Sequence, residues 1–142
     1  MSKIDTTQWK DYAIADLFEI KKGTRLTRAN MKDGDIRYIG ASTFNNGITA
    51  QISNDEHLHP ANSISVSYNG SVGEAFYQDE PFWASDDVNV LYPKFQLTRN
   101  IALFIIPIIK QIGKQYAFID KWKKEDMERD MLKLPAKSDG TP

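Results

Sequence analysis

Alternating apolar and polar residues dominate the middle of the chain, where three short strands are predicted between residues 64 and 92. Apolar side chains alternate with polar ones over residues 64–68, and the dipeptide Asn69-Gly70 follows at once. Alternation that ends at Asn-Gly is the strongest short-range sign of a β-hairpin, because both residues accept the left-handed backbone angles of a tight turn. We therefore expect a return strand over residues 72–77 and a third strand over residues 88–92, with Val88, Val90 and Tyr92 on one face.

Shorter strand patterns come before this region. We expect strands at residues 9–14, 18–21, 36–41 and 48–52. Between them, the hydroxyl of Thr27 is placed to cap a short helical turn that runs to Met31. Turns are predicted at Asp33-Gly34 and Asn45–Gly47, and a loop broken by proline at residues 55–62.

Two helices are predicted near the C-terminus. Residues 98–111 are apolar on nearly all sides, which indicates a buried helix, kinked at Pro107 and ended near Gly113. A second helix is expected over residues 122–132. Met127 and Met131 should share one face of this helix. Glu125 should form an i,i+4 ion pair with Arg129. Together the elements predict an α+β fold, with an irregular mixed or mostly antiparallel sheet of short strands and two C-terminal helices.

Charge changes this picture through its distribution along the chain. The net charge is only −1, but residues 21–37, here called the basic segment, carry six Lys or Arg against two acids. Residues 38–93 contain no Lys or Arg, and basic residues return after them, with a lysine cluster at Lys121, Lys123 and Lys124. Separate basic regions can hold DNA on one face of a nearly neutral protein, although they can equally serve to solvate the surface.

Composition limits the other possibilities. The 142 residues predict one domain over the whole chain, and the absence of cysteine excludes disulfides and thiolate chemistry. The first twelve residues do not form a signal peptide, and the longest apolar run, residues 101–109, is too short to span a bilayer. We therefore expect a soluble, cytoplasmic protein.

A series of phrases along the chain resembles the target recognition domain of type I restriction-modification specificity subunits. The phrases, in order, are DLFEIKKGTRLTRANM, GDIRYIGASTFNNGI, ISVSYNGSVGEAFYQDEPFWASDDVNVLY, IALFIIPIIK, KWKKEDM and MLKLPAKSDGTP. The resemblance implies that the chain binds one half of a bipartite double-stranded DNA target through the major groove. It also implies that the chain performs no chemistry and acts with methyltransferase and restriction subunits, and with a second specificity half as a further candidate partner. In the family, the last phrase leads into a long spacer helix and a second recognition domain. Neither lies within these residues, so we expect the front part of a longer subunit or a piece trimmed from one.

Residues of four groups are candidates for DNA contact. Lys21, Lys22, Arg25 and Arg28 of the basic segment are expected on phosphates, which supply most of the affinity. Base edges require side chains with donors and acceptors, and these are found at Thr43, Asn45, Asn46, Tyr68, Asn69 and Ser71. The three lysines of the lysine cluster complete the set. Turn chemistry explains Asn46 and the Tyr68–Ser71 group at least as well.

Other kinds of chemistry find weaker support. Asp5, Glu19 and Lys21 loosely match a nuclease pattern, while His57 and His59 lack a further metal ligand. Neighbouring residues of a strand point to opposite faces, so Asp86-Asp87 cannot act as a carboxylate pair there. No N/D-P-P-Y/F segment or glycine-rich cofactor loop is present, and no cofactor is expected. The alternatives left open are a recognition module of a fused restriction-methylation enzyme, a metal-dependent nuclease, and a protein- or carbohydrate-binding module. The last would use Trp9, Trp83 and Trp122 as platforms.

Overall fold

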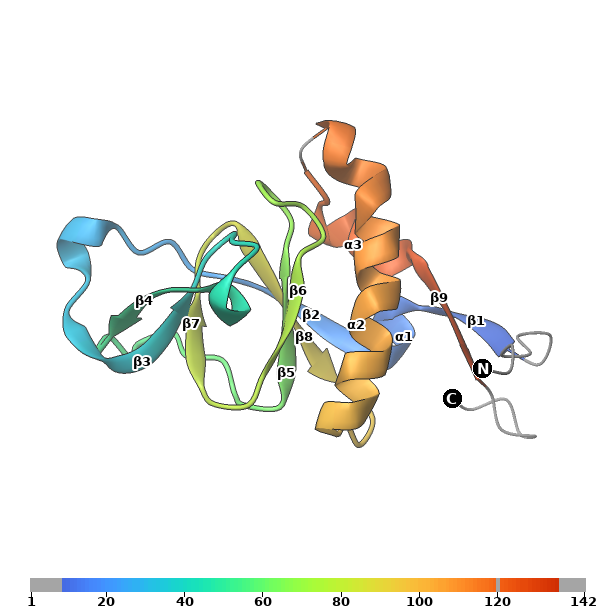
Figure 1. The fold of residues 1–142 in the computed structure, drawn as a ribbon, viewed down its shortest axis with the longest axis horizontal. Coiled ribbons are helices and arrows are strands. Elements are labelled where there is room, and N and C mark those ends of the chain that lie inside the picture. Colours follow the sequence, from blue (N-terminus) through green and yellow to red (C-terminus); the bar gives the residue numbers. More distant parts are fainter. Residues whose placement is uncertain (1–8, 120, 136–142) are drawn as a thin grey trace.

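Short strands in three small sheets, together with one long helix, make up the computed structural model of the chain (Figure 1). The structure describes residues 9–119 and 121–135. Of the three sheets, one has four strands, one has three and one has two. This mixture of mostly antiparallel short strands and a few helices confirms the predicted fold class.

The four-stranded sheet contains the predicted hairpin. Its order is β2 (Phe18–Lys22), β8 (Val88–Pro93), β5 (Ser63–Ser67) and β6 (Ala75–Gln78), and every pairing is antiparallel. The hairpin of β5 and β6 is confirmed, but β6 begins at Ala75, so the connection at Asn69-Gly70 is a longer loop than a two-residue turn. We call residues 68–74 the hairpin loop.

The three-stranded sheet has the order β4 (Ile48–Ile52), β3 (Asp33–Ile39) and β7 (Phe82–Ala84). β3 and β7 run parallel, which makes the fold mixed. The turn predicted at Asp33-Gly34 is wrong, because these residues open β3 beside a bulge. A side-chain carbon on Gly34 would lie 2.6 Å from the Ile52 carbonyl, so the glycine permits close strand approach rather than a turn.

The C-terminal part differs most from its prediction. Helix α3 covers only Lys124–Arg129, and Met131–Pro135 form strand β9, which pairs antiparallel with β1 (Trp9–Ala13). Leu132 and Leu134 are buried and Met131 is exposed, which is the two-residue period of a strand. The second helix expected within residues 122–132 is therefore present but shorter, and its shared Met127–Met131 face is wrong.

The local pairing on α3 also differs. Arg129 forms its ion pair with Asp126 at 2.7 Å rather than with Glu125. At the other short helical turn, η1 (Arg28–Asn30), Thr27 occupies the cap position as predicted. Its hydroxyl makes no capping hydrogen bond there, so that part of the prediction is wrong. The four-residue helix α1 (Ile14–Leu17) was not predicted.

Helix α2 (Arg99–Gly113) begins after Thr98, whose hydroxyl accepts a hydrogen bond from the Ile101 amide at 3.2 Å. Pro107 lies within the helix, which continues to the predicted end at Gly113 and then into η3 (Lys114–Ile119). One face of α2 is buried in the main core. The opposite face leaves Leu103 55% exposed, so the prediction of burial on nearly all sides is wrong. No helix in the described residues is both long and apolar enough to cross a membrane.

Strand β8 joins the two larger parts of the fold. Leu91 packs into the main core with α2, while Val88 and Val90 pack on the other face against Ile39 and Phe82 of the three-stranded sheet. The face predicted to be shared by alternate residues of this strand is thus present. Because β8 is buried on both faces, the three-stranded sheet is held to the rest of the molecule by apolar packing.

Candidate nucleic-acid interface

One end of the four-stranded sheet brings several candidate residues together. β2 and β5 both run antiparallel to β8, so their C-terminal ends meet its N-terminal end. In this register Lys22 lies opposite Asn89 and Ser67 lies opposite Val88. The C-terminal end of β2 and the start of the hairpin loop therefore lie at the same end of the sheet.

Polar contacts to the turn before β8 fix the conformation of the hairpin loop at this end of the sheet. The Tyr68 amide donates to the Asp87 carbonyl at 3.0 Å, and the Tyr68 hydroxyl donates to the Asp86 carbonyl. The Asn69 amide group donates to the Asp87 carboxylate at 3.1 Å. Positive φ angles at Ser71 and Gly70 complete a tight bend. These bonds occupy Tyr68 and Asn69 and leave Ser71 exposed.

The same loop is joined to the distant lysine cluster. Asn69 and Lys121 form an isolated antiparallel bridge, and the Trp122 amide donates to the Tyr68 carbonyl at 2.6 Å. We call this contact the junction. Lys121 and Lys123 are exposed beside it, whereas Lys124 is partly covered and pairs with Glu128 at 3.4 Å. Two candidate groups that are about fifty residues apart in sequence therefore form one surface.

A buried aromatic group supports the junction from below. The Trp122 ring is fully buried, stacks on Tyr116 at 5.5 Å between centroids, and donates to the Asp130 carboxylate at 2.7 Å. The same carboxylate accepts from the Tyr116 hydroxyl at 2.8 Å. Burial, together with the hydrogen bond to this carboxylate, raises the pKa of Tyr116 to about 12. The backbone at residues 121–122 is thus fixed by a well-packed support.

Residues 42–46, here called the tip loop, lie next to the hairpin loop. A side-chain carbon on Gly70 would lie 3.8 Å from Cβ of Ala41, the residue before the tip loop. In Figure 1 the light-green hairpin loop accordingly lies between the teal tip loop and the orange segment after α2. The tip loop, the hairpin loop and the lysine cluster together are called the loop surface.

Within the tip loop, both asparagine side chains donate hydrogen bonds to the rest of the fold, with Asn46 partly buried and Asn45 exposed. Asn46 donates to the Tyr77 carbonyl and to the Gln78 side chain, each at 3.3 Å, and accepts through its carbonyl from Gln78 at 2.9 Å. Asn45 donates to the Ile48 carbonyl at 3.3 Å. Both have positive φ, as the predicted turn at Asn45–Gly47 requires. Thr43 is exposed, and its hydroxyl has no hydrogen bond to any described residue.

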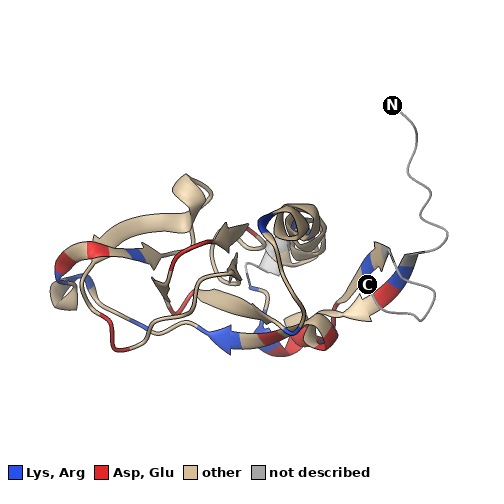
Figure 2. Cartoon of the chain, turned by 90° about the horizontal axis from the view of Figure 1, so that it is seen from below, with Lys and Arg blue, Asp and Glu red and all other residues tan. Residues whose placement is uncertain are grey.

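The basic segment leads away from the loop surface. Figure 2 shows basic residues at the end of β2 and along the chain that continues from it to the three-stranded sheet, and Figure 1 places η1 at the far end from α2. Lys22, Arg25 and Arg28 are exposed and have no ion pair within the described residues. Lys21 is paired with Glu19 at 2.8 Å. Arg37 is not free either, because it bridges Asp79 and Glu80.

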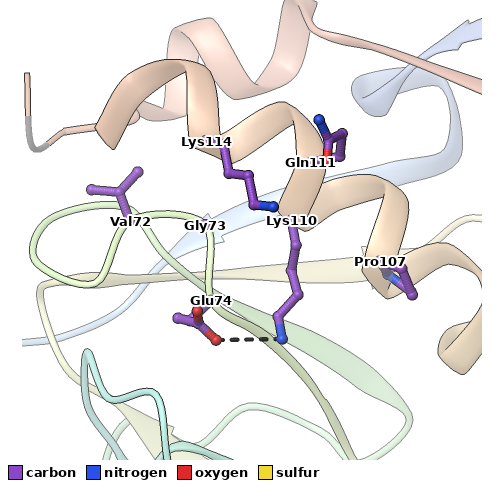
Figure 3. Close-up of a pocket in the computed structure, with 7 residues that line it drawn as sticks. All are labelled: Val72, Gly73, Glu74, Pro107, Lys110, Gln111 and Lys114. Atoms are coloured by element: carbon purple, nitrogen blue, oxygen red, sulfur yellow. Dashed lines mark ion pairs between the residues drawn. The ribbon is translucent and has the colours of Figure 1, made fainter. Parts of the chain in front are cut away.

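Lys110 of α2 and Lys114, the first residue of η3, lie beside the loop surface, although no sequence pattern selected them. Lys110 and Lys114 line a pocket beside the hairpin loop, and Lys110 pairs with Glu74 at 3.4 Å (Figure 3). The helix reaches this loop through two glycines, since a side-chain carbon on Gly113 would lie 2.6 Å from Cα of Gly73. The i, i+4 spacing of Lys110 and Lys114 could have indicated a shared helix face. Their position beside the hairpin loop, however, depends on the tertiary structure.

Groups considered for other chemistry lie apart or are engaged. Glu19 and Lys21 form an exposed ion pair, and the hydrogen bond from Lys21 lowers the pKa of Glu19. Asp5 lies outside the described residues. Among the described residues, no group of three His, Cys, Asp or Glu could hold a metal ion.

The two histidines of the loop before β5 have separate environments. His57 packs edge-on against Trp83, while His59 is buried and shares a 2.6 Å hydrogen bond with Tyr92. Burial lowers the pKa of His59 to about 4.

The tryptophans do not form the expected binding platforms, and Asp86-Asp87 do not lie on a strand. Trp83 and Trp122 are buried, which removes two of the three proposed platforms, and the Trp9 side chain lies outside the described residues. Asp86 and Asp87 lie in the turn before β8 rather than on a strand.

The chain matches a family model over residues 6–139, and that family is described as the type I restriction modification DNA specificity domain. The chain belongs to this family. The family inferred from the resemblance is thereby confirmed.

Relatives of the specificity domain agree with this assignment. The chain is 38% identical over 135 residues to a protein of Heyndrickxia coagulans named "Type II restriction enzyme BgcI specificity subunit S.BcgI". That match covers 94% of the chain but 40% of the relative. The chain therefore spans less than half the length of this curated relative.

Solved structures share the fold of the specificity domain at low identity. The type I restriction-modification S subunit from M. genitalium superposes with a TM-score of 0.73 at 17% identity, over 91% of the chain and 35% of that protein. The HsdS subunit from Thermoanaerobacter tengcongensis gives 0.67 at 15% identity, over 91% and 34% respectively. A third match, from a structure of a type I R-M system, gives 0.68 at 13% identity, over 94% and 35%.

Proposed function

We propose that this specificity domain binds one half of a bipartite double-stranded DNA target in a sequence-dependent manner. It performs no chemistry itself and directs partner methyltransferase and restriction subunits. The family match supports DNA specificity. The observation that carries the structural part is the junction, because it unites polar loops and lysines on one surface.

The two kinds of contact have separate tasks on this surface. Exposed lysines and arginines contact phosphates and provide affinity that depends on salt, whereas loop side chains that reach base edges provide sequence choice. Lys121 and Lys123 flank the hairpin loop, and Lys22 lies at the same end of the four-stranded sheet. We propose that phosphate contacts surround the loops, with Ser71 and Thr43 as the candidates that reach outward.

Several residues of the original candidate set have a structural task instead. Asn46, Tyr68 and Asn69 spend their side-chain donors on holding loops in place. Lys21 is neutralised by Glu19. We propose that these four residues shape or tune the surface, and that Lys114, which has no ion pair within the described residues, joins the phosphate contacts.

Selection from a random duplex DNA library tests the proposal. The chain should enrich one short motif, and its affinity for that motif should fall steeply with salt. Replacing Lys121 and Lys123 by alanine should weaken binding to all duplexes about equally. Lys10→Ala with Lys133→Ala, the same charge change on the β1–β9 sheet, is the matched control. Failure to enrich any motif would reject sequence-dependent binding.

The partners of the complete protein are also part of the proposal. The relative from Heyndrickxia coagulans is named as a specificity subunit of a restriction enzyme. Recognition there belongs to a subunit, which supports partner chains for methylation and cleavage here. Neither the nuclease nor the binding-module alternative gains an observation, because Glu19 pairs with Lys21 and two tryptophans are buried. Co-purification of the full subunit with a methyltransferase subunit from the same cells would test the assembly.

A further inference from the structure

Phe44 projects from the tip loop and is 78% exposed, the highest value among the large apolar side chains in the described ranges. Single exposed apolar residues are common on protein surfaces. Phe44 differs because the surrounding loop is fixed by hydrogen bonds in the conformation that exposes it. The question is therefore what this ring meets when the domain binds its ligand.

The backbone on either side of Phe44 is fixed locally. The Ser42 hydroxyl accepts from the Phe44 amide at 3.1 Å and donates to the Phe44 carbonyl at 3.3 Å. The same carbonyl accepts from the Gly47 amide at 2.9 Å. These bonds fix the backbone at Phe44, so the loop directs the side chain outward in advance of binding.

A second set of contacts fixes the loop on the sheet. Asn46 is bound to Tyr77 and Gln78 of β6, and Asn45 and Asn46 both hold positive φ angles. A non-glycine residue in this region carries strain, which persists only where the surrounding structure determines it. Among the exposed tip-loop side chains, that of Asn45 is held by its hydrogen bond to the Ile48 carbonyl, which leaves Thr43 and Phe44 as the two that no hydrogen bond holds within the described residues.

We propose that Phe44 contacts the C5 methyl group of a thymine in the major groove, with Thr43 beside it. This assignment rests on the proposed function. The thymine methyl is the apolar group that base pairs present in the major groove, and Phe is among the residues that pack against it. A fixed loop suits this role, because a preordered backbone loses little conformational freedom on binding.

The test replaces thymine by deoxyuridine, which lacks only the methyl group, at each position of the motif selected by the chain. At one thymine, the swap should weaken binding of the wild-type chain by about fourfold, the equivalent of one buried methyl group. Phe44→Ala should weaken binding to the thymine duplex by roughly tenfold and should no longer distinguish deoxyuridine from thymine. Circular dichroism should show an unchanged fold, since the ring is exposed.

Met131→Ala is the matched control, because Met131 is an exposed apolar residue on the β1–β9 sheet. It should leave both affinity and the deoxyuridine effect as in the wild type. Three results would overturn the inference while leaving sequence-specific binding intact. The first is that no thymine is sensitive to the swap and Phe44→Ala binds as the wild type does. The second is that one thymine is sensitive and Phe44→Ala keeps the same sensitivity. The third is that no thymine is sensitive but Phe44→Ala binds more weakly. The last would indicate a ring inserted between bases.

Discussion

The basic segment and the loop surface differ in how the chain builds them. The basic segment is continuous in sequence, is largely exposed, and has four cations without ion partners in the part of the chain that the structure describes. The loop surface gathers residues from three distant stretches, and each of its loops is fixed by hydrogen bonds. The difference suggests a division in which local sequence supplies charge and tertiary contacts supply shape.

Trp122 gives the largest expected effect, because it supports the junction on which the loop surface depends. Trp122→Ala should lower the free energy of unfolding by about 3–5 kcal/mol through loss of a fully buried ring. Urea unfolding measures this change. Trp122→Phe, which keeps an aromatic ring but loses the bond to Asp130, should cost less. Equal losses in both variants would contradict the importance of ring packing.

His59 tests how firmly the three-stranded sheet is held to β8, since its ring stacks on Phe82 and bonds to Tyr92. Its pKa falls from 6.5 to about 4 on folding, so below pH 6.5 the unfolded chain takes up the proton first. Stability from this group is therefore complete above pH 6.5 and is lost as the pH falls toward 4, by about 3 kcal/mol.

His59→Gln, which cannot titrate, is the comparison for this prediction. Denaturant unfolding between pH 7 and pH 4 should show a shallower fall in stability for this variant than for the wild type. Acidic groups titrate in both proteins and cancel in the difference. Identical curves would show that His59 is not held neutral by burial.

Lys22 and Arg25 test the role of the basic segment. Replacing both by alanine should flatten the plot of log affinity against log salt concentration by about 1.8, close to 0.9 for each lost phosphate contact. The selected motif should not change, because phosphates carry no base identity. Fluorescence anisotropy over a salt series measures the slope. An unchanged slope would place DNA away from this segment.

Thr43 gives the smallest expected effect and tests the other side of the comparison. Thr43→Ala should leave the salt slope unchanged but relax base choice at one motif position, by about 1 kcal/mol for one lost hydrogen bond. Methylome sequencing of cells that carry the variant in the full subunit would reveal the relaxed position. Asn46→Ala is the contrast, because it should destabilise the tip loop itself. A motif identical to the wild type in the Thr43 variant would remove Thr43 from the reading surface.

The sequence by itself determined the features that depend on neighbouring residues. Alternation predicted the β5–β6 hairpin and the shared face of β8, and the two asparagines before Gly47 predicted the turn of the tip loop. Apolar content also located α2 and its end at Gly113. These signals are local, because backbone angles and side-chain periods depend on residues a few positions apart.

Only the tertiary structure decided which candidates share a surface and which are already engaged. The stretch after Asp130 carries both helical and strand signals, and pairing with β1 made it a strand. The bonds from Asn46 to β6 and the bridge between Asn69 and Lys121 each need a partner from elsewhere in the chain. Such partners are chosen by packing and hydrogen bonding in the folded state, and neither periodicity nor composition encodes them locally.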